Sequence, residues 1–244
     1  MKIKKVIVIA NNKIGDARKR EARGKLKREV IEFLEARGVG VVEEAGKANA
    51  VVTIGGDGTI LYVKQKIQGK PIFAIGGKFS AICQTKKTNW KKPLERAIAR
   101  GAVEKRSMLA CSFDGKKSED ALNEICVRNR SCRAVWFELT AGKKKFVFRA
   151  DGIIFATPTG STAYAYSCGG KRLARNARGY EIVAVAPYRR EFKPLVINER
   201  EKALLRVKSH GEIEVVVDGQ FGHKLRGNNV LVFKSSRKTG FLKA

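Results

Sequence analysis

The sequence predicts two domains of different classes, an α/β N-terminal domain with a Rossmann-like parallel sheet and a β-rich, β-sandwich-like C-terminal domain. Up to about residue 100, short apolar runs alternate with segments in which apolar residues recur at helical spacing. After Gly101, strand-like runs follow one another without a long amphipathic helix between them. We therefore expect domains at residues 1–100 and 101–234, and the sequence leaves open whether the basic tail, residues 235–244, packs back on the first domain.

The first domain is expected to follow the order β-α-β-β-α-β, with one more helix after it. The expected elements, in chain order, are residues 3–10, 16–37, 39–42, 51–54, 59–68, 71–75 and 90–100. Asp16 stands where it can cap the first helix, and Gly38 stands where a helix-ending glycine belongs. This order is typical of a mostly parallel, helix-covered sheet, in which ligands bind at the carboxyl ends of the strands.

In the second domain, turn residues separate a series of short expected strands. They are residues 103–113, 121–129, 133–140, 145–149, 152–157, 182–186, 194–197, 203–208, 212–217 and 229–234. Residues 162–167 are the one short segment with helical character.

The composition indicates a folded chain with a basic surface. Of the 244 residues, 43% are hydrophobic and 30% are charged, which supports a real core. The net charge of +28 is spread evenly, because residues 1–100 and the remaining residues each contribute +14. A dedicated nucleic-acid arm would be lopsided, so we expect a general attraction for polyanions such as nucleotides, and only weak, non-specific binding of nucleic acid.

Several classes of site and location are disfavoured by simple counts. No run approaches 18 consecutive apolar residues, so we expect no membrane span, and the apolar run 6–10 is too short for a signal peptide. His210 and His223 lack ligand-spaced partners, so no zinc site is expected. An odd number of cysteines without CxxC pairing favours reduced thiols in the cytoplasm; they are Cys83, Cys111, Cys126, Cys132 and Cys168.

A glycine-rich turn, Gly55-Gly56-Asp57-Gly58-Thr59, follows the expected strand 51–54. Glycine allows positive φ and close approach of a ligand, and the amides of such a turn, followed by a helix N-terminus, attract anions. Asp57 would repel phosphate, so its presence needs another explanation. It is either a base that accepts the proton of a substrate hydroxyl or the N-cap of an ordinary strand-turn-helix junction.

Two further stretches carry polar groups in apolar surroundings. Asn123-Glu124 lies in an apolar expected strand, where the pair can grip a ribose diol or be solvated on an edge strand. Asp151-Gly152 begins a strand that ends in Thr157-Pro158-Thr159-Gly160-Ser161-Thr162-Ala163-Tyr164. Its hydroxyls and its tyrosine ring suit a ribose or an amide ligand, and the alternative is a Ser/Thr turn that only caps a helix.

Together these residues resemble the NAD kinase family. Its pattern joins a Gly-Gly-Asp-Gly-Thr turn, an Asn-Glu pair, an Asp-Gly pair and a Thr-Pro-Thr-Gly-Ser-Thr-Ala-Tyr turn, which are matched in order by 55–59, 123–124, 151–152 and 157–164. Lipid kinases and phosphofructokinases carry close relatives of the first turn, whereas the eight-residue match is specific. The resemblance covers about residues 50–220.

The resemblance implies transfer of a phosphoryl group from ATP, or from polyphosphate in some members, to the 2′-hydroxyl of the adenosine ribose of NAD. Mg²⁺ or another divalent cation would bind together with the donor. The sequence shows no dedicated set of metal ligands. The resemblance also implies a dimer or tetramer and gives Asp57 the role of orienting and deprotonating the hydroxyl. The other implied site residues are Gly55, Gly56, Gly58 and Thr59 for phosphate, Asn123 and Glu124 for the ribose or adenine side, and Asp151, Thr159, Ser161, Thr162, Ala163, Tyr164 and Ser167 for the rest of the dinucleotide pocket.

The chain departs from the family pattern in two places. Residues 76–85 replace the usual Gly-x-Asn-x-Gly-x-Leu-Gly-Phe-Leu loop and lack its Asn and two of its glycines, which makes Lys78 a candidate phosphate contact. Lys193-Pro194 stands in place of the usual Arg-Pro. Neither change removes Asp57, so we expect a divergent, active member.

Two other functions remain open at this point. A kinase acting on a lipid or sugar hydroxyl shares the glycine-rich turn, but the stretch 157–164 argues against it. A non-catalytic nucleic-acid-binding protein would fit the charge, but no interleaved stacking aromatics or known module support it.

Overall fold

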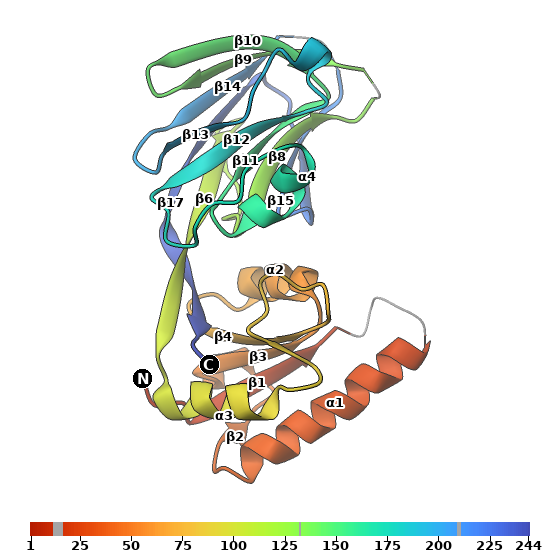
Figure 1. Ribbon diagram of the computed structural model, residues 1–244, viewed down its shortest axis with the longest axis vertical. Helices are drawn as coiled ribbons and strands as arrows, with labels where there is room; N and C mark the ends of the chain where they lie inside the picture. Colours follow the sequence, from red (N-terminus) through yellow and green to blue (C-terminus); the bar gives the residue numbers. More distant parts are fainter. Residues whose placement is uncertain (12–16, 132, 209–210) are drawn as a thin grey trace. The chain divides into compact units, whose positions relative to one another are not determined.

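The structure is a computed structural model, which describes residues 1–11, 17–131, 133–208 and 211–244 (Figure 1). The chain divides into two compact units: unit 1 is Met1–Lys105 with Thr239–Ala244, and unit 2 is Arg106–Lys238. Asp16, Cys132 and His210, which entered the expectations above, lie outside the described residues. No helix within the described ranges is long and apolar enough to cross a membrane.

Unit 1 is an α/β unit whose strands β2, β1, β3, β4 and β5 pair in parallel in that order, as expected. Its elements are β1 (Lys5–Ala10), α1 (Ala17–Glu35), β2 (Gly40–Val41), the 3₁₀ turn η1 (Ala45–Lys47), β3 (Ala50–Ile54), α2 (Asp57–Lys66), β4 (Ile72–Gly76), β5 (Thr85–Lys86) and α3 (Lys91–Arg100). The two-residue β5 is absent from the sequence-based expectation.

Helices cover both faces of this sheet (Figure 1). Val30 and Leu34 of α1 and Leu94 of α3 share one core with the strands and are completely buried. The helix α2 lies on the other face, where Ile60 and Val63 are buried. The segments with apolar residues at helical spacing form helices, because each helix can then bury its apolar stripe against the sheet.

Unit 2 is built almost entirely of strands. Its elements are β6 (Val103–Phe113), β7 (Lys116–Lys117), β8 (Glu124–Asn129), β9 (Val135–Ala141), β10 (Lys144–Ala150), β11 (Gly152–Ala156), η2 (Gly160–Thr162), α4 (Tyr164–Ser167), β12 (Gly179–Val185), η3 (Tyr188–Arg190), β13 (Leu195–Asn198), β14 (Ala203–Val207), β15 (Ile213–Val217), β16 (Phe221–Lys224) and β17 (Asn229–Leu242). Both β6 and β17 begin or end in unit 1, so the expected tail 235–244 is mostly the continuation of a long strand.

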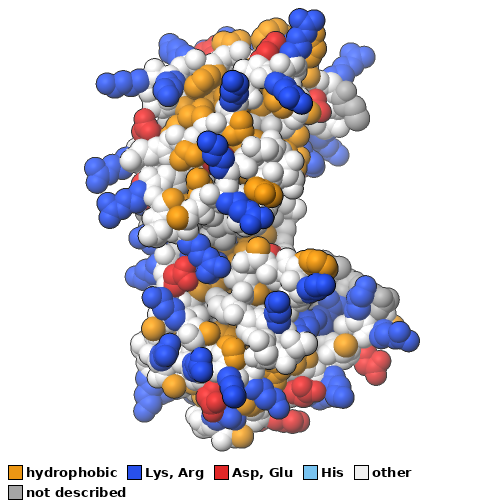
Figure 2. All heavy atoms as spheres, in the orientation of Figure 1, with side chains coloured by type: hydrophobic (Ala, Val, Ile, Leu, Met, Phe, Trp, Pro, Cys, Tyr) orange, Lys and Arg blue, Asp and Glu red, His pale blue; other side chains and the backbone are white. Residues whose placement is uncertain are grey.

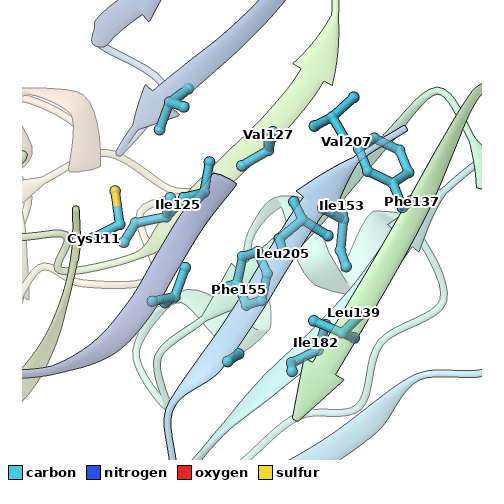
Figure 3. Close-up of a cluster of buried hydrophobic side chains, with 14 of the residues drawn as sticks. Cys111, Ile125, Val127, Phe137, Leu139, Ile153, Phe155, Ile182, Leu205 and Val207 are labelled. Atoms are coloured by element: carbon cyan, nitrogen blue, oxygen red, sulfur yellow. The ribbon is translucent and has the colours of Figure 1, made fainter. Parts of the chain in front are cut away.

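The core of unit 2 lies between two antiparallel layers, as expected for a β-sandwich. One layer has the order β13-β12-β11-β8-β15-β16, and the other contains β10-β9-β14-β17. Inward side chains of the two layers meet in one cluster, with Phe155 and Ile125 on the first layer and Phe137 and Leu205 on the second (Figure 3). The opposite face of the first layer carries α4, whose Ala165 packs on the strands.

Lys and Arg side chains are spread over the visible surface of both units, without one dominant cluster (Figure 2). This agrees with the even division of the +28 net charge along the chain.

We predict that Phe155→Ala lowers the free energy of unfolding by about 3–5 kcal/mol, because the ring is completely buried between the layers and its removal leaves a cavity. Val147→Ala is the control: Val147 is 65% exposed, so its loss should change stability by about 0.5 kcal/mol or less. Denaturant titrations measure both variants. Equal stabilities would contradict the assignment of this core.

Candidate active site

The glycine-rich turn joins the carboxyl end of β3 to the first turn of α2. Gly56 is the N-cap of α2, with an extended backbone, and no side chain caps the helix. Asp57 is instead the first helical residue, where its negative charge faces the positive end of the helix dipole. The N-cap alternative for Asp57 is therefore wrong.

The carboxylate of Asp57 is bound by the loop that follows β4. Its Oδ2 accepts a hydrogen bond of 2.8 Å from the Ala81 amide, and its Oδ1 accepts one of 3.1 Å from the Ile82 amide. The Cys83 sulfur lies 3.7 Å from Oδ1. Asp57 is half-buried, so a ligand group can still reach the lone pairs that the amides leave free.

Close packing requires glycine at position 55, and no glycine of this turn is required by an unusual dihedral angle. None of Gly55, Gly56 and Gly58 has a positive φ, so the expectation based on left-handed backbone is wrong here. A Cβ on Gly55 would lie 2.9 Å from the Cβ of Thr59, which packs under the turn and is 5% exposed. A side chain at Gly56 would meet nothing closer than the Ser80 hydroxyl at 3.9 Å, so this backbone is open to an approaching group.

In unit 2, Asn123 and Glu124 lie at the start of β8, in the middle of the first layer. Since β8 pairs with β11 on one side and β15 on the other, the edge-strand alternative is wrong. Asn123 is 7% exposed and Glu124 is 6% exposed. Asn123 Oδ1 and Glu124 Oε2 are buried without a hydrogen-bond partner, which is costly unless a ligand supplies one.

Glu124 is held in its neutral form at neutral pH. Burial, and next the negative charge of Asp218, raise the pKa of Glu124 from 4.5 to about 8. A neutral carboxyl group offers one O–H donor as well as an acceptor, so it can bond a ligand hydroxyl in either direction.

The turn after β11 is locked to Asn123. Thr157 donates its amide to the Asn123 carbonyl (2.9 Å) and its hydroxyl to the Leu122 carbonyl, and this hydroxyl accepts the Gly160 amide at 3.0 Å. A Cβ on Gly160 would lie 2.6 Å from the Asn123 Cα, so only glycine fits. The two motifs that the sequence separates by more than thirty residues therefore form one piece of structure.

Some hydroxyls of this turn are used internally. Ser161 is completely buried; it donates to the Pro158 carbonyl at 2.9 Å and accepts the Leu173 amide at 2.9 Å. Thr162 donates to the Thr159 carbonyl at 3.3 Å but is exposed. Thr159, Ala163, Tyr164 and Ser167 are all partly or fully exposed along the same turn and α4, and Tyr164 is 40% exposed.

Asp151 lies at the other end of β11 from this turn, roughly 20 Å away along the strand at about 3.4 Å per residue. The structure therefore does not bring its backbone beside Thr159. The Asp151 carboxylate nevertheless contributes, after burial and other neighbouring charges, to the raised pKa of the Tyr164 phenol.

In unit 1, Lys78 is exposed, with its Nζ 5.6 Å from the ring centre of the 91% exposed Phe79.

Two buried acids near these motifs were not singled out from the sequence. Asp218 accepts the amides of residues 122–124, and Glu181 Oε1 accepts the Lys171 amide at 2.7 Å. The Asp218-Gly219 pair between two apolar runs is a hairpin signal, but nothing local in the sequence shows what its carboxylate binds.

Each unit offers its own set of chemical groups. Unit 1 offers a carboxylate at a helix N-terminus beside open backbone, and unit 2 offers donors and acceptors for a polar ligand. Within the described ranges, no three His, Cys, Asp or Glu side chains gather as metal ligands.

Comparison with known proteins places the chain in a family. Residues 122–244 match the model of the ATP-NAD kinase C-terminal domain. The NAD kinase of Methanothermobacter thermautotrophicus is 33% identical over 205 residues, which is 80% of this chain and 72% of that protein. The chain belongs to the NAD kinase family. The NAD kinase of Koribacter versatilis is also 33% identical, over 76% of this chain and 69% of that protein.

Solved structures of this family agree with the fold. An NAD kinase from Archaeoglobus fulgidus, in complex with ATP, superposes with a TM-score of 0.84 at 27% identity, covering 98% of this chain and 93% of that one. Yeast NADH kinase, complexed with NADH, gives a TM-score of 0.81 at 18% identity and supports the fold alone, covering 100% of this chain and 84% of that one. The predictions of an NAD kinase family enzyme with an α/β part and a β-rich part are confirmed, and the lipid-kinase and nucleic-acid alternatives gain no support.

We predict that Glu124→Gln removes a pH dependence of stability. Between pH 4.5 and about 8 the unfolded chain releases the Glu124 proton while the folded chain keeps it, so the free energy of unfolding of the wild type falls as pH rises. The steepest slope from one such group is about 1.4 kcal/mol per pH unit.

Denaturant titrations at pH 5, 6.5 and 8 would measure the difference between the two proteins. The variant should gain stability relative to the wild type as pH rises, because the amide cannot ionise. A constant difference across this range would contradict the neutral state of Glu124.

Proposed function

We propose that this protein transfers the terminal phosphoryl group of ATP to the 2′-hydroxyl of the adenosine ribose of NAD, giving NADP and ADP. The observation that carries the proposal is the Asp57 carboxylate, fixed by two backbone amides at the N-terminus of α2. Family membership supports the reaction, and the ATP complex of the Archaeoglobus relative supports ATP as donor. Polyphosphate is the alternative donor.

In this proposal Asp57 is the base. One of its lone pairs would accept the proton of the 2′-hydroxyl as the oxygen attacks the terminal phosphorus and the bond to the leaving phosphate oxygen breaks. The Ala81 and Ile82 amides fix the direction of the carboxylate. Positioning of this kind matters more than covalent chemistry in phosphoryl transfer.

The phosphates of the donor would lie against the glycine-rich turn. Gly55, Gly56, Gly58 and Thr59 supply a backbone without bulky side chains at a helix N-terminus, where negative charge is stabilised. Exposed Lys78 would add a positive point charge. A divalent cation, most simply Mg²⁺ bound to the triphosphate, would neutralise further charge in the transition state.

The dinucleotide would bind the polar groups of unit 2. Asn123 and Glu124, whose buried oxygens lack partners, would bond ribose or adenine groups. Thr159, Thr162, Ala163, Tyr164 and Ser167 would line the rest of the pocket, with Asp151 as its most distant member. Ser161, which is fully hydrogen-bonded inside its turn, would support the pocket without touching the ligand.

The proposal includes domain roles, location and assembly. We assign donor handling and catalysis to the α/β part, residues 1–100, and NAD binding to the β-rich part, residues 101–234. Cys83, Cys111, Cys126 and Cys168 are thiols and not members of disulfides, which supports a cytoplasmic enzyme. A homodimer or homotetramer rests on family resemblance alone.

We predict that Asp57→Asn lowers kcat for NADP formation by about 10²–10⁴-fold, since the amide cannot accept the proton. NAD binding, measured by calorimetry, should change little, which also shows that the variant is folded. The assay supplies Mg²⁺ and NAD, with ATP and polyphosphate compared side by side. Undiminished turnover in the variant would overturn the role of Asp57.

We predict that Lys78→Ala raises the KM for the donor several-fold and leaves the KM for NAD unchanged, because one phosphate contact of about 1 kcal/mol is lost. Lys66→Ala is a matched control, since Lys66 is also exposed but lies at the other end of α2. If both variants alter the donor KM equally, Lys78 makes no specific contact.

A further inference from the structure

Asp218 occupies a strained and buried position in the turn between β15 and β16. Its φ is 53° and that of Gly219 is 65°, so two consecutive residues are left-handed, as in the tight Asp-Gly turns of hairpins. Left-handed backbone is unfavourable for a residue with a side chain, and Asp218 is only 3% exposed. A cost of this kind calls for a compensating interaction.

The carboxylate of Asp218 supplies that interaction by accepting three consecutive backbone amides. Its Oδ2 accepts the Leu122 amide at 3.0 Å, and its Oδ1 accepts the amides of Asn123 at 2.7 Å and Glu124 at 3.3 Å. In return, the Asp218 amide donates to the Glu124 carbonyl at 2.9 Å. Hydrogen bonds to a charged acceptor are roughly twice as strong as neutral ones.

These bonds act where the regular sheet stops. The ladder between β8 and β15 ends with the pair Ile125 and Val217, and that between β8 and β11 ends with Glu124 and Ala156. Beyond these pairs, Asp218 binds residues 122–124 on the β15 side, through its carboxylate and, at Glu124, through its backbone amide. The direction of the Asn123 and Glu124 side chains therefore depends on it, since the backbone sets the direction of each Cα–Cβ bond.

We propose that Asp218 is a positioning residue of the dinucleotide site: by gripping the amides of residues 122–124 it aims the unpartnered oxygens of Asn123 and Glu124 at the ligand. This inference rests on the proposed function in one respect, namely that NAD binds this pair. Asp218 itself touches no ligand in this proposal, because its oxygens are occupied by the backbone.

Asp218 also acts on Glu124 through its charge. Its carboxylate is the charged group from the neighbouring turn that raises the pKa of Glu124, after burial. Two other titratable groups share the face of Glu124: Glu181, in the same cross-strand row through Ala156, and the Cys126 thiol, whose pKa burial raises to about 12. Removal of the Asp218 charge should lower the pKa of Glu124 while Glu181 and Cys126 stay in place.

The chain contains a matched control in Asp114. Asp114 and Gly115 form another left-handed Asp-Gly turn, with φ values of 50° and 72°. The Asp114 carboxylate also accepts two backbone amides, from Arg226 at 2.8 Å and Gly227 at 2.7 Å, but it is exposed and holds no site residue. Asp114→Asn therefore also removes a carboxylate that accepts backbone amides, but it should not disturb Asn123 or Glu124.

The test is calorimetric titration of the full-length wild type, Asp218→Asn and Asp114→Asn with NAD and, separately, with ATP. In Asp218→Asn the amide NH₂ must face at least one backbone N–H, so NAD should bind roughly tenfold more weakly. ATP binding should change by no more than about twofold. Asp114→Asn should change the affinities for NAD and for ATP by no more than about twofold.

The same titrations with NAD are then repeated from pH 6 to 9. The NAD affinity should change near pH 8 in the wild type and at a lower pH in Asp218→Asn.

Asp218→Glu serves if Asp218→Asn does not fold. It keeps the charge but displaces the acceptor oxygens by one methylene, so it should weaken NAD binding while the inflection near pH 8 stays in place. Equal effects of the Asp218 and Asp114 variants on NAD, or equal effects of an Asp218 variant on NAD and ATP, would overturn the positioning role. A wild type that binds NAD but forms no NADP would overturn the proposed reaction and leave this comparison intact. A wild type that binds no NAD would overturn both.

Discussion

The close approach of the Gly160 and Asn123 backbones is the constraint on which the proposed dinucleotide site depends. No side chain fits between them, because a Cβ on Gly160 would lie 2.6 Å from the Asn123 Cα. The amide and hydroxyl of Thr157 tie the same two segments together. A shift of the turn 157–164 therefore shifts Asn123, and this shared geometry explains why both motifs have to be present together in one sequence.

In the described part of the chain, Asp57, Asp114 and Asp218 each bind backbone amides through the carboxylate, and the consequences depend on burial. Asp114 does so on the surface, where the result is only a closed loop. Asp218 does so in the interior, where its charge adds to the effect of burial in raising the pKa of Glu124. Asp57 lies between these extremes, because it is half-buried: its direction is fixed, and part of its acceptor capacity remains open. This intermediate position suits the role of base that we propose for it.

The fold class could be predicted because apolar periodicity is local, whereas much of the site geometry depends on partners distant in sequence. The sequence allows Asn123 and Glu124 to lie on an edge strand or on a central strand. Only the pairing of β15 with β8 shows that their strand is central. Asp218 is more than ninety residues from the amides it accepts, so no local pattern shows its role. Asp151 precedes Thr157 closely in sequence, but the extended strand β11 separates the two in space, while the Asp151 charge still acts on Tyr164 farther along the chain.

The altered loop after β4 shows how a sequence can diverge while its contacts to Asp57 are kept. The family pattern loses an Asn and two glycines here, yet Asp57 is held by the backbone amides of Ala81 and Ile82, which any residue other than proline supplies. The Cys83 side chain now fills the space beside Gly76, where a Cβ would lie 2.7 Å from the Cys83 Cβ. Substitution in this loop therefore changes its exposed side chains, such as Lys78, without removing the backbone amides that hold the Asp57 carboxylate. Variable side chains and constant contacts to Asp57 are compatible because different atoms of the same loop provide them.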